Sequence, residues 1–140
     1  MKVLFVCHGN VNRSAAAEII AKQDYPSWEI KSCGLKTKDG KITAKKMRDA
    51  LTASGYTTEG IRSTVITQTL VDWADQIFYM DDANEDRFVE QFGAMEKAQK
   101  LSNLIPGVKK IPDPAFAEGT DMHFHVIDLI KTALSKWTTG

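Results

Sequence analysis

Blocks of apolar residues alternate with polar stretches along this chain, and their lengths predict strands that alternate with helices. Residues 3–6 form a continuous apolar run, which is typical of a strand buried on both faces. Residues 14–21 are rich in alanine and predict a helix with Ser14 as its N-cap. The turn-like residues 7–13 lie between them. We therefore expect the chain to open with a strand, a loop and a helix.

The same pattern continues to the end of the chain. Further strands are predicted at residues 28–32, 76–79 and 108–111, the last of them stopped by Pro112. Helices are predicted at residues 43–53, with Gly55 as C-terminal cap, and at residues 67–72 and 95–104. Another helix is predicted to begin after a cap at Asp81 and to run through Phe92. A final helix, capped by Thr120 or Asp121, is indicated by the helical spacing of Ile127, Ile130, Leu134 and Trp137.

This alternation predicts a single α/β domain over residues 1–140. We expect three layers, with a four-stranded parallel sheet in the strand order 2-1-3-4 and helices on both of its faces.

Composition and charge narrow the classes of function. Basic and acidic residues each number 18, so the formal net charge is zero. The charge therefore gives no indication of a nucleic-acid or membrane partner, and no apolar stretch approaches transmembrane length. Two cysteines without metal-ligand spacing predict neither a disulfide framework nor a metal site. We expect a reduced, cytoplasmic setting.

The residues between the first strand and the first helix carry the candidate chemistry. Ligand sites in such sheets lie beyond the carboxyl ends of the strands, and a helix N-terminus there favours an anion. Gly9 and Asn10 tolerate left-handed backbone angles, so successive N–H groups can converge. Arg13 adds a planar fork of donors suited to phosphoryl oxygens. Cys7 stands first in the loop, where all of these groups favour a thiolate, and Ser14 can donate a hydrogen bond to it.

The stretch Val6-Cys7-His8-Gly9-Asn10-Val11-Asn12-Arg13-Ser14 resembles the phosphate-binding loop of the low-molecular-weight protein tyrosine phosphatases, C-x-G-N-x-C-R-S-P. Further stretches match this family in order along nearly the whole chain. They are residues 32–34 (S-A-G in the family), 62–67 (within H-R-S-R-Q-L-T), 74–84 (A-D-x-I-x-x-M-D-x-x-N) and 111–116 (I-x-D-P-Y-Y).

The resemblance implies a phosphomonoester hydrolase, specifically a protein tyrosine phosphatase, that needs no metal and no cofactor. Cys7 would attack phosphorus, and Asp113 would protonate the leaving oxygen and then activate water. The Arg13 guanidinium and backbone amides of the loop would hold the phosphoryl group. The phosphate-binding residues would be His8, Gly9, Asn10, Val11, Asn12, Arg13 and Ser14, the last with its hydroxyl. Asn10, Ser14 and Ser32 would support the loop, and Leu35 and Phe116 are candidates for the cleft wall. Its partners would be a phosphotyrosine-bearing protein or a small aryl phosphate, and we expect a monomer or weak dimer.

Several positions depart from the family pattern. Asn12 replaces a second loop cysteine, and Ile61 stands where the family has a histidine that hydrogen-bonds the loop. Ala115 and Phe116 replace the two tyrosines of D-P-Y-Y. These changes concern loop support and the cleft wall, so they bear on the substrate more than on the chemistry.

Two alternatives stay open at the level of sequence. Arsenate reduction would need further cysteines on a mobile segment, and none follows Cys33. A phosphate- or phosphoprotein-binding module with weak turnover would need neither Cys7 nor Asp113. If Ser32 faces the Cys7 loop, as the resemblance implies, Cys33 points to the opposite face of the sheet, because side chains alternate along a strand.

Overall fold

A parallel sheet in the order β2-β1-β3-β4 forms the centre of the fold. The computed structural model describes residues 1–139. The strands are β1 (Lys2–Cys7), β2 (Glu29–Gly34), β3 (Gln76–Tyr79) and β4 (Ala98–Lys100). Each neighbouring pair is parallel, so the predicted strand order and direction are confirmed.

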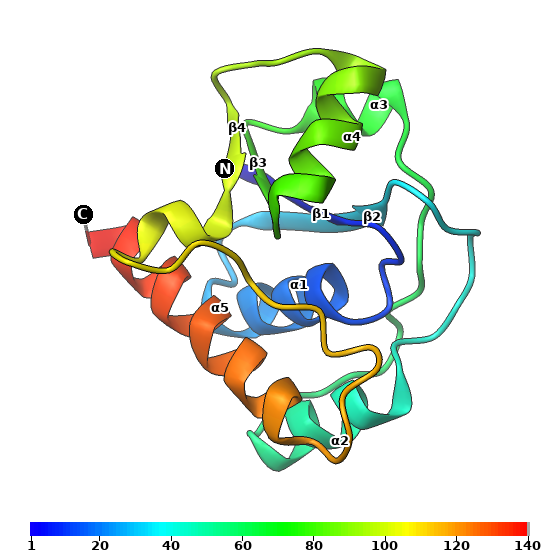
Figure 1. Cartoon of the computed structure of the whole chain (residues 1–140), viewed down its shortest axis with the longest axis vertical. Helices are drawn as coiled ribbons and strands as arrows, with labels where there is room; N and C mark the ends of the chain where they lie inside the picture. The colour runs from blue at the N-terminus through cyan, green and yellow to red at the C-terminus, as the bar shows by residue number, and fades with distance from the viewer. Residues whose placement is uncertain (140) are drawn as a thin grey trace.

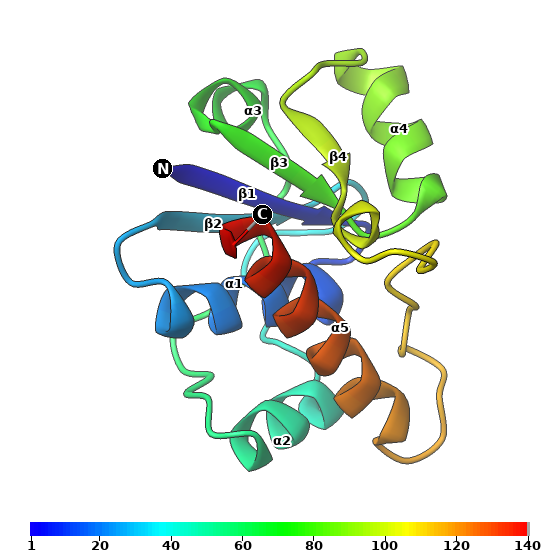
Figure 2. The same cartoon turned by 90° about the vertical axis from the view of Figure 1, so that its left-hand side faces the viewer.

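Helices cover both faces of this sheet, as predicted (Figures 1 and 2). One face carries α1 (Arg13–Asp24) and α5 (Asp121–Thr139), with α2 (Lys45–Ala53) packed against α5. The other face carries α3 (Gln68–Trp73) and α4 (Asp82–Phe92). Figure 2 shows the two groups of helices on either side of the strands. No helix within residues 1–139 has the length and apolarity that crossing a bilayer would require.

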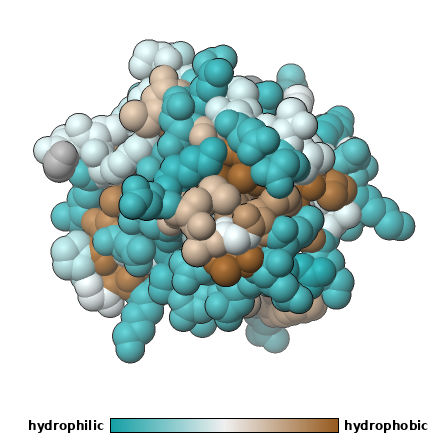
Figure 3. Space-filling view, turned by 90° about the horizontal axis from the view of Figure 1, so that it is seen from above, coloured by the Kyte–Doolittle hydropathy of each residue, from teal (hydrophilic) through white to brown (hydrophobic). Residues whose placement is uncertain are grey.

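Alternation along β1 divides the core into two clusters. Val3 and Phe5 point into the larger cluster, which they share with α1 and α5. Leu4 and Val6 point into the smaller cluster beneath α3 and α4. Because β1 is central and buried on both faces, every residue from 3 to 6 is apolar, as the sequence indicated. The face seen in Figure 3 is mostly hydrophilic, with hydrophobic residues gathered near its centre and in smaller patches at its sides.

The prediction for the fourth strand was wrong. Residues 98–100, which were expected to be helical, form β4, and only Leu101–Leu104 turns into a short 3-10 helix, η1. Residues 108–111 do not join the sheet as a strand; the N–H of Ile111 instead donates to the carbonyl of Met80, 2.8 Å away, just beyond the end of β3. Residues 108–111 are Val-Lys-Lys-Ile, of which only Ile111 is buried, whereas the three residues of the edge strand β4, Ala-Gln-Lys, are all half-buried. Periodicity therefore gave no signal for β4.

The start of α1 also differs from the prediction. The helix begins at Arg13, its N-cap is Asn12, and Asn12 makes no side-chain capping bond. Ser14 lies inside the first turn rather than before it, and its hydroxyl bonds side chains of the loop instead. The cap predicted at Asp81 is confirmed, since its carboxylate accepts from the N–H of Asn84 at 2.8 Å.

The chain leaving β2 packs directly on the loop that follows β1. Gly34 lies so close that a Cβ atom there would come within 2.6 Å of the carbonyl oxygen of His8, so only glycine fits. Leu35 donates its N–H to the carbonyl of Cys7, and Lys36 donates to that of His8. The Thr37 hydroxyl donates to the carbonyl of Gly9 at 2.8 Å. The loop is therefore fixed from outside by its neighbour as well as by its own bonds.

Candidate active site

Cys7 ends β1 and lies at the base of the loop 8–12, only 3% exposed. The backbone N–H of Asn10 donates to its sulfur over 3.2 Å. Asn10 has φ 55°, in the left-handed region. Asparagine adopts that conformation more readily than most residues. The loop geometry thus aims a backbone N–H at the sulfur.

A second donor to the sulfur comes from the first turn of α1. Ser14 Oγ lies 2.9 Å from Cys7 Sγ and accepts a hydrogen bond from the Asn10 amide at 2.8 Å. Because the Ser14 oxygen already accepts from Asn10, its own proton is free to point at the sulfur. Two donors and the N-terminus of α1 are therefore directed at the Cys7 sulfur.

The side chain of Asn10 joins three segments of the chain. Its Nδ2 donates to Ser14 and, at 2.9 Å, to the hydroxyl of Ser32 on β2. Its Oδ1 accepts the backbone N–H of Thr64 at 2.9 Å. The structure therefore brings together Asn10, Ser14 and Ser32, the three residues expected to support the loop.

Arg13 is buried, with 4% of its side chain exposed, and it lies beneath the loop between two aspartates. Its Nη1 donates to Asp81 at 2.6 Å and to the carbonyl of Ile111 at 3.0 Å. Its Nη2 lies 3.8 Å from Asp113 Oδ2. Asp113 is therefore close to the loop, although the strand expected to bring it there does not form. The backbone bond from Ile111 to Met80 and the bond from Arg13 to the Ile111 carbonyl hold this segment instead.

Opposing effects act on the Asp81 carboxylate. Burial disfavours its charged form, but the hydrogen bonds from Arg13 and from the Asn84 N–H outweigh burial and hold the pKa of Asp81 below its usual range. Asp81 thus stays ionised and keeps Arg13 in place. The sequence indicated Asp81 only as a helix cap, and its second role as the partner of Arg13 was missed.

His8 lies half-buried in the loop beside α4. Asn84 accepts the N–H of Met80 with its Oδ1, which turns its Nδ2 toward His8 Nδ1, 3.2 Å away. The Nδ1 atom is then an acceptor, so the proton of the neutral ring is on Nε2. Burial is the main cause that lowers the pKa of His8; Asp81 opposes it, and Arg13 acts in the same direction as burial. The ring is therefore neutral at neutral pH.

The remaining predicted residues take different places. Gly9 and Val11 are half-exposed on the loop, and Asn12 is buried at the start of α1. Leu35, expected at the cleft wall, is 7% exposed and packs in the smaller core cluster, so it contributes little surface to a cleft. Phe116 is 99% exposed on the loop that carries Asp113, so its ring is free to contact another molecule.

Comparison with known proteins agrees with this geometry. The sequence profile of the family described as "Low molecular weight phosphotyrosine protein phosphatase" matches residues 2–140. The chain belongs to this family. Its enzymes are cysteine-dependent phosphatases, and this phosphatase has the predicted sheet order and the loop that the resemblance implied.

Individual relatives are similar along nearly their whole length. The chain is 29% identical to the low molecular weight protein-tyrosine-phosphatase Ptp of Acinetobacter johnsonii, over 97% of this chain and 94% of that one. The structure superposes on the YwlE arginine phosphatase of Geobacillus stearothermophilus with TM-score 0.86 and 27% identity, covering 99% and 90% of the two chains. A low molecular weight phosphatase from T. tengcongensis has TM-score 0.91, 21% identity, and coverage of 99% and 98%, and shares the fold.

The ion pair between Asp81 and Arg13 gives a prediction about stability and pH. Asp81→Asn removes a charged acceptor, and we expect the free energy of unfolding at neutral pH to fall by about 1.5–3 kcal/mol. Because the folded-state pKa of Asp81 is lowered, its contribution is complete above the unfolded pKa, about 3.9. It is lost as the pH falls through the folded-state value.

Urea unfolding of wild type and variant between about pH 7 and pH 3 measures this difference, which should shrink only below about pH 4. Asp82→Asn is the matched control, since Asp82 is 78% exposed and bonds only Lys100. It should change stability by at most about 0.5 kcal/mol. A difference for Asp81→Asn that persists unchanged in acid would show that packing, not charge, is what Asp81 contributes.

Proposed function

We propose that this phosphatase hydrolyses phosphotyrosine in proteins through a phosphocysteine intermediate on Cys7, with Asp113 as general acid and base. The proposal rests on the groups that surround the Cys7 sulfur. Asn10 and Ser14 supply donors at 3.2 and 2.9 Å, and Arg13 lies beneath the same loop with Asp113 near its free end. Such a nucleophile at the base of an oxyanion cradle suits covalent phosphoryl transfer.

In the first step the phosphoryl group lies in the loop. Backbone N–H groups of residues 8–13 bind its oxygens, together with Arg13; that of Asn10 already donates to the Cys7 sulfur. Since Nη1 of Arg13 is already used by Asp81 and Ile111, the donors left for substrate are those on the side of Nη2. The Cys7 thiolate attacks phosphorus, the bond to the leaving oxygen breaks, and Asp113 gives that oxygen a proton. The buried positive charge and the loop amides stabilise the transition state.

The second step returns the enzyme to its starting state. Asp113, now a carboxylate, takes a proton from a water molecule as the water attacks phosphorus. The sulfur–phosphorus bond breaks, inorganic phosphate forms, and Cys7 leaves as a thiolate. The Ser14 hydroxyl, 2.9 Å from the sulfur, stabilises that leaving thiolate. Asp113 is 53% exposed, which gives water access to it.

Charge near the loop favours phosphotyrosine over phosphoarginine, the substrate class suggested by the YwlE relative. Lys36 belongs to the segment that packs on the loop, and lysines at 38, 41 and 46 follow it; Lys46 Nζ donates to the carbonyl of Ala117 at 3.0 Å, on the Asp113 segment. This basic rim attracts a phosphate dianion and acidic neighbours, and it repels a guanidinium. The exposed Phe116 ring offers an apolar face to a phenyl group.

The alternatives have less support. Cys33 is fully buried in the cluster on the opposite face from Cys7, as its strand position predicted. Burial raises the pKa of its thiol well above the usual value, with Cys7 and Glu18 adding to the effect, so it is poorly suited to pass a disulfide outward in arsenate reduction. Phosphate binding without turnover would leave the position of Asp113 beside Arg13 unexplained.

The loss of turnover on replacing Asp113 should depend on the leaving group. Asp113→Asn removes the transferable proton, so turnover of phosphotyrosine, whose leaving oxygen is basic, should fall roughly 10²–10⁴-fold. The loss should be smaller with nitrophenyl phosphate, which needs less protonation. Steady-state kcat across an aryl series measures this, with Glu118→Gln, exposed on the same loop, as the unchanged control. A uniform loss across the series would contradict the assignment of Asp113 as the acid.

The substrate class can be tested with two peptides that differ only in the phosphorylated residue. We expect kcat/KM for a phosphotyrosine peptide to exceed that for a phosphoarginine peptide by about 10-fold or more. Lys36→Glu together with Lys38→Glu should narrow this preference, because both side chains are exposed near the loop. Faster hydrolysis of phosphoarginine by the wild-type protein would contradict the proposed substrate while leaving the cysteine chemistry intact.

A further inference from the structure

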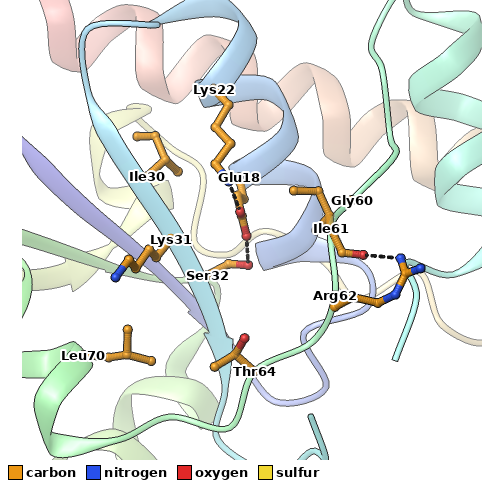
Figure 4. A pocket seen from close by; sticks show the side chains of 10 residues that line it. All are labelled: Glu18, Lys22, Ile30, Lys31, Ser32, Gly60, Ile61, Arg62, Thr64 and Leu70. Atoms are coloured by element: carbon orange, nitrogen blue, oxygen red, sulfur yellow. Dashed lines mark hydrogen bonds and ion pairs between the residues drawn. The ribbon is translucent and has the colours of Figure 1, made fainter. Parts of the chain in front are cut away.

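Glu18 is a buried carboxylate on α1, 8% exposed, that the mechanism above does not use. Its Oε1 accepts the hydroxyl proton of Ser32 at 2.5 Å. Its Oε2 bonds the ammonium of Lys22, one helical turn further on, at 2.5 Å. Figure 4 shows Glu18 pointing from the helix toward Ser32 on β2, with Lys22 above it. The carboxylate is therefore the outer end of the hydrogen-bonded chain that reaches Cys7.

The groups at the two ends of this series of hydrogen bonds decide which atom donates and which accepts at every step. The backbone N–H of Thr64 can only donate, so it fixes Asn10 Oδ1 as the acceptor and turns Nδ2 toward the two serines. A carboxylate can only accept, so the Ser32 hydroxyl donates its hydrogen bond to Glu18. The oxygen of Ser32 is then free to accept from Asn10.

We propose that Glu18 is a positioning residue that acts on Cys7 through Ser32 and Asn10. Glu18 accepts a hydrogen bond from the Ser32 hydroxyl, and Asn10 can therefore donate its two side-chain N–H groups to Ser32 and Ser14. Ser14 in turn donates to the sulfur. Glu18 thus supplies, through Ser32, support for the loop at the side where Ile61 offers no hydrogen bond.

Loss of the acceptor leaves two arrangements, and both are unfavourable. Either the Ser32 hydroxyl stays buried without an acceptor, or the Asn10 amide flips to receive its proton. A flipped amide loses the N–H of Thr64 and faces Ser14 with an oxygen, which draws the Ser14 proton away from Cys7. The flipped arrangement takes the Ser14 donor away from the sulfur, whereas the unflipped one destabilises the loop around Cys7. Buried groups left without a partner carry the full cost of desolvation.

The space beside Glu18 decides which replacement is informative. A cavity of about 480 Å³ adjoins it, lined in part by Ser32, Ile61 and Thr64, and Figure 4 shows these side chains around it. Truncation to alanine would let water from this cavity accept the Ser32 proton. Methionine has a similar volume and no strong acceptor, whereas glutamine keeps an acceptor oxygen.

The test compares Glu18→Met, Glu18→Gln and Lys22→Met in the full chain. The first readout is the rate at which iodoacetamide alkylates Cys7, followed by peptide mapping; the second is turnover of an aryl phosphate. Glu18→Met should lower both roughly 10-fold. Glu18→Gln and the matched control Lys22→Met, which removes the part-buried ion pair but leaves Glu18 Oε1 to accept from Ser32, should each stay within about 2-fold of wild type.

A second comparison separates positioning from general stability. In a Ser32→Ala background no hydroxyl needs an acceptor, so adding Glu18→Met should cause less than about 2-fold further loss. This comparison stands even if Glu18→Met alone unfolds. An equal loss in that background, or unchanged alkylation and turnover in folded Glu18→Met, would overturn the proposal. The turnover readout rests on the proposed function, whereas alkylation tests Glu18 even if no phosphate ester is cleaved.

Discussion

The side-chain amide of Asn10 is the contact on which the rest of the site depends, because it joins segments that are far apart in the sequence. It bonds Ser14 on α1, Ser32 on β2 and the backbone of Thr64 in the chain before α3. Its backbone N–H also reaches the Cys7 sulfur. A left-handed φ of 55° makes both sets of bonds possible at one residue. The protein's own hydrogen bonds therefore hold the loop in place.

Charge balance explains why the site tolerates so many buried polar groups. Arg13 has Asp81 on one side and Asp113 on the other. Glu18 has Lys22 and the Ser32 hydroxyl. Each buried charge thus has a partner of opposite sign or a hydrogen bond, which is the condition for burying charge at moderate cost. The phosphoryl group would enter where Arg13 still has free donors.

Sequence patterns predicted the parts of this fold that have strong local signals. The apolar run of β1, the alanine-rich α1 and the loop between them were visible, and with them Cys7, Asn10, Arg13 and Ser14. Asp113 was predicted for a partly wrong reason, since the strand expected before it does not form. The edge strand β4 was missed because half-buried polar residues show no periodicity.

Residues that act through tertiary contacts were harder to predict. The pairing of Asp81 with Arg13 joins positions 68 residues apart, and no spacing rule reports such a contact. Glu18 had a weak local signal, because it lies four residues after Ser14 and so on the same face of the helix. The burial of Leu35 depended on which side of the sheet its segment packs against, and the sequence left that open.

Direct detection of the covalent intermediate tests the account most sharply. Wild-type protein and Asp113→Ala would be mixed with an aryl phosphate, quenched in acid within the first turnover, and mapped by peptide mass spectrometry. The account predicts one phosphoryl group on the peptide that contains Cys7, in larger amount in Asp113→Ala because water activation is slowed. A phosphoryl group on another residue, or product released by wild type with no phosphorylated peptide in either protein, would contradict it.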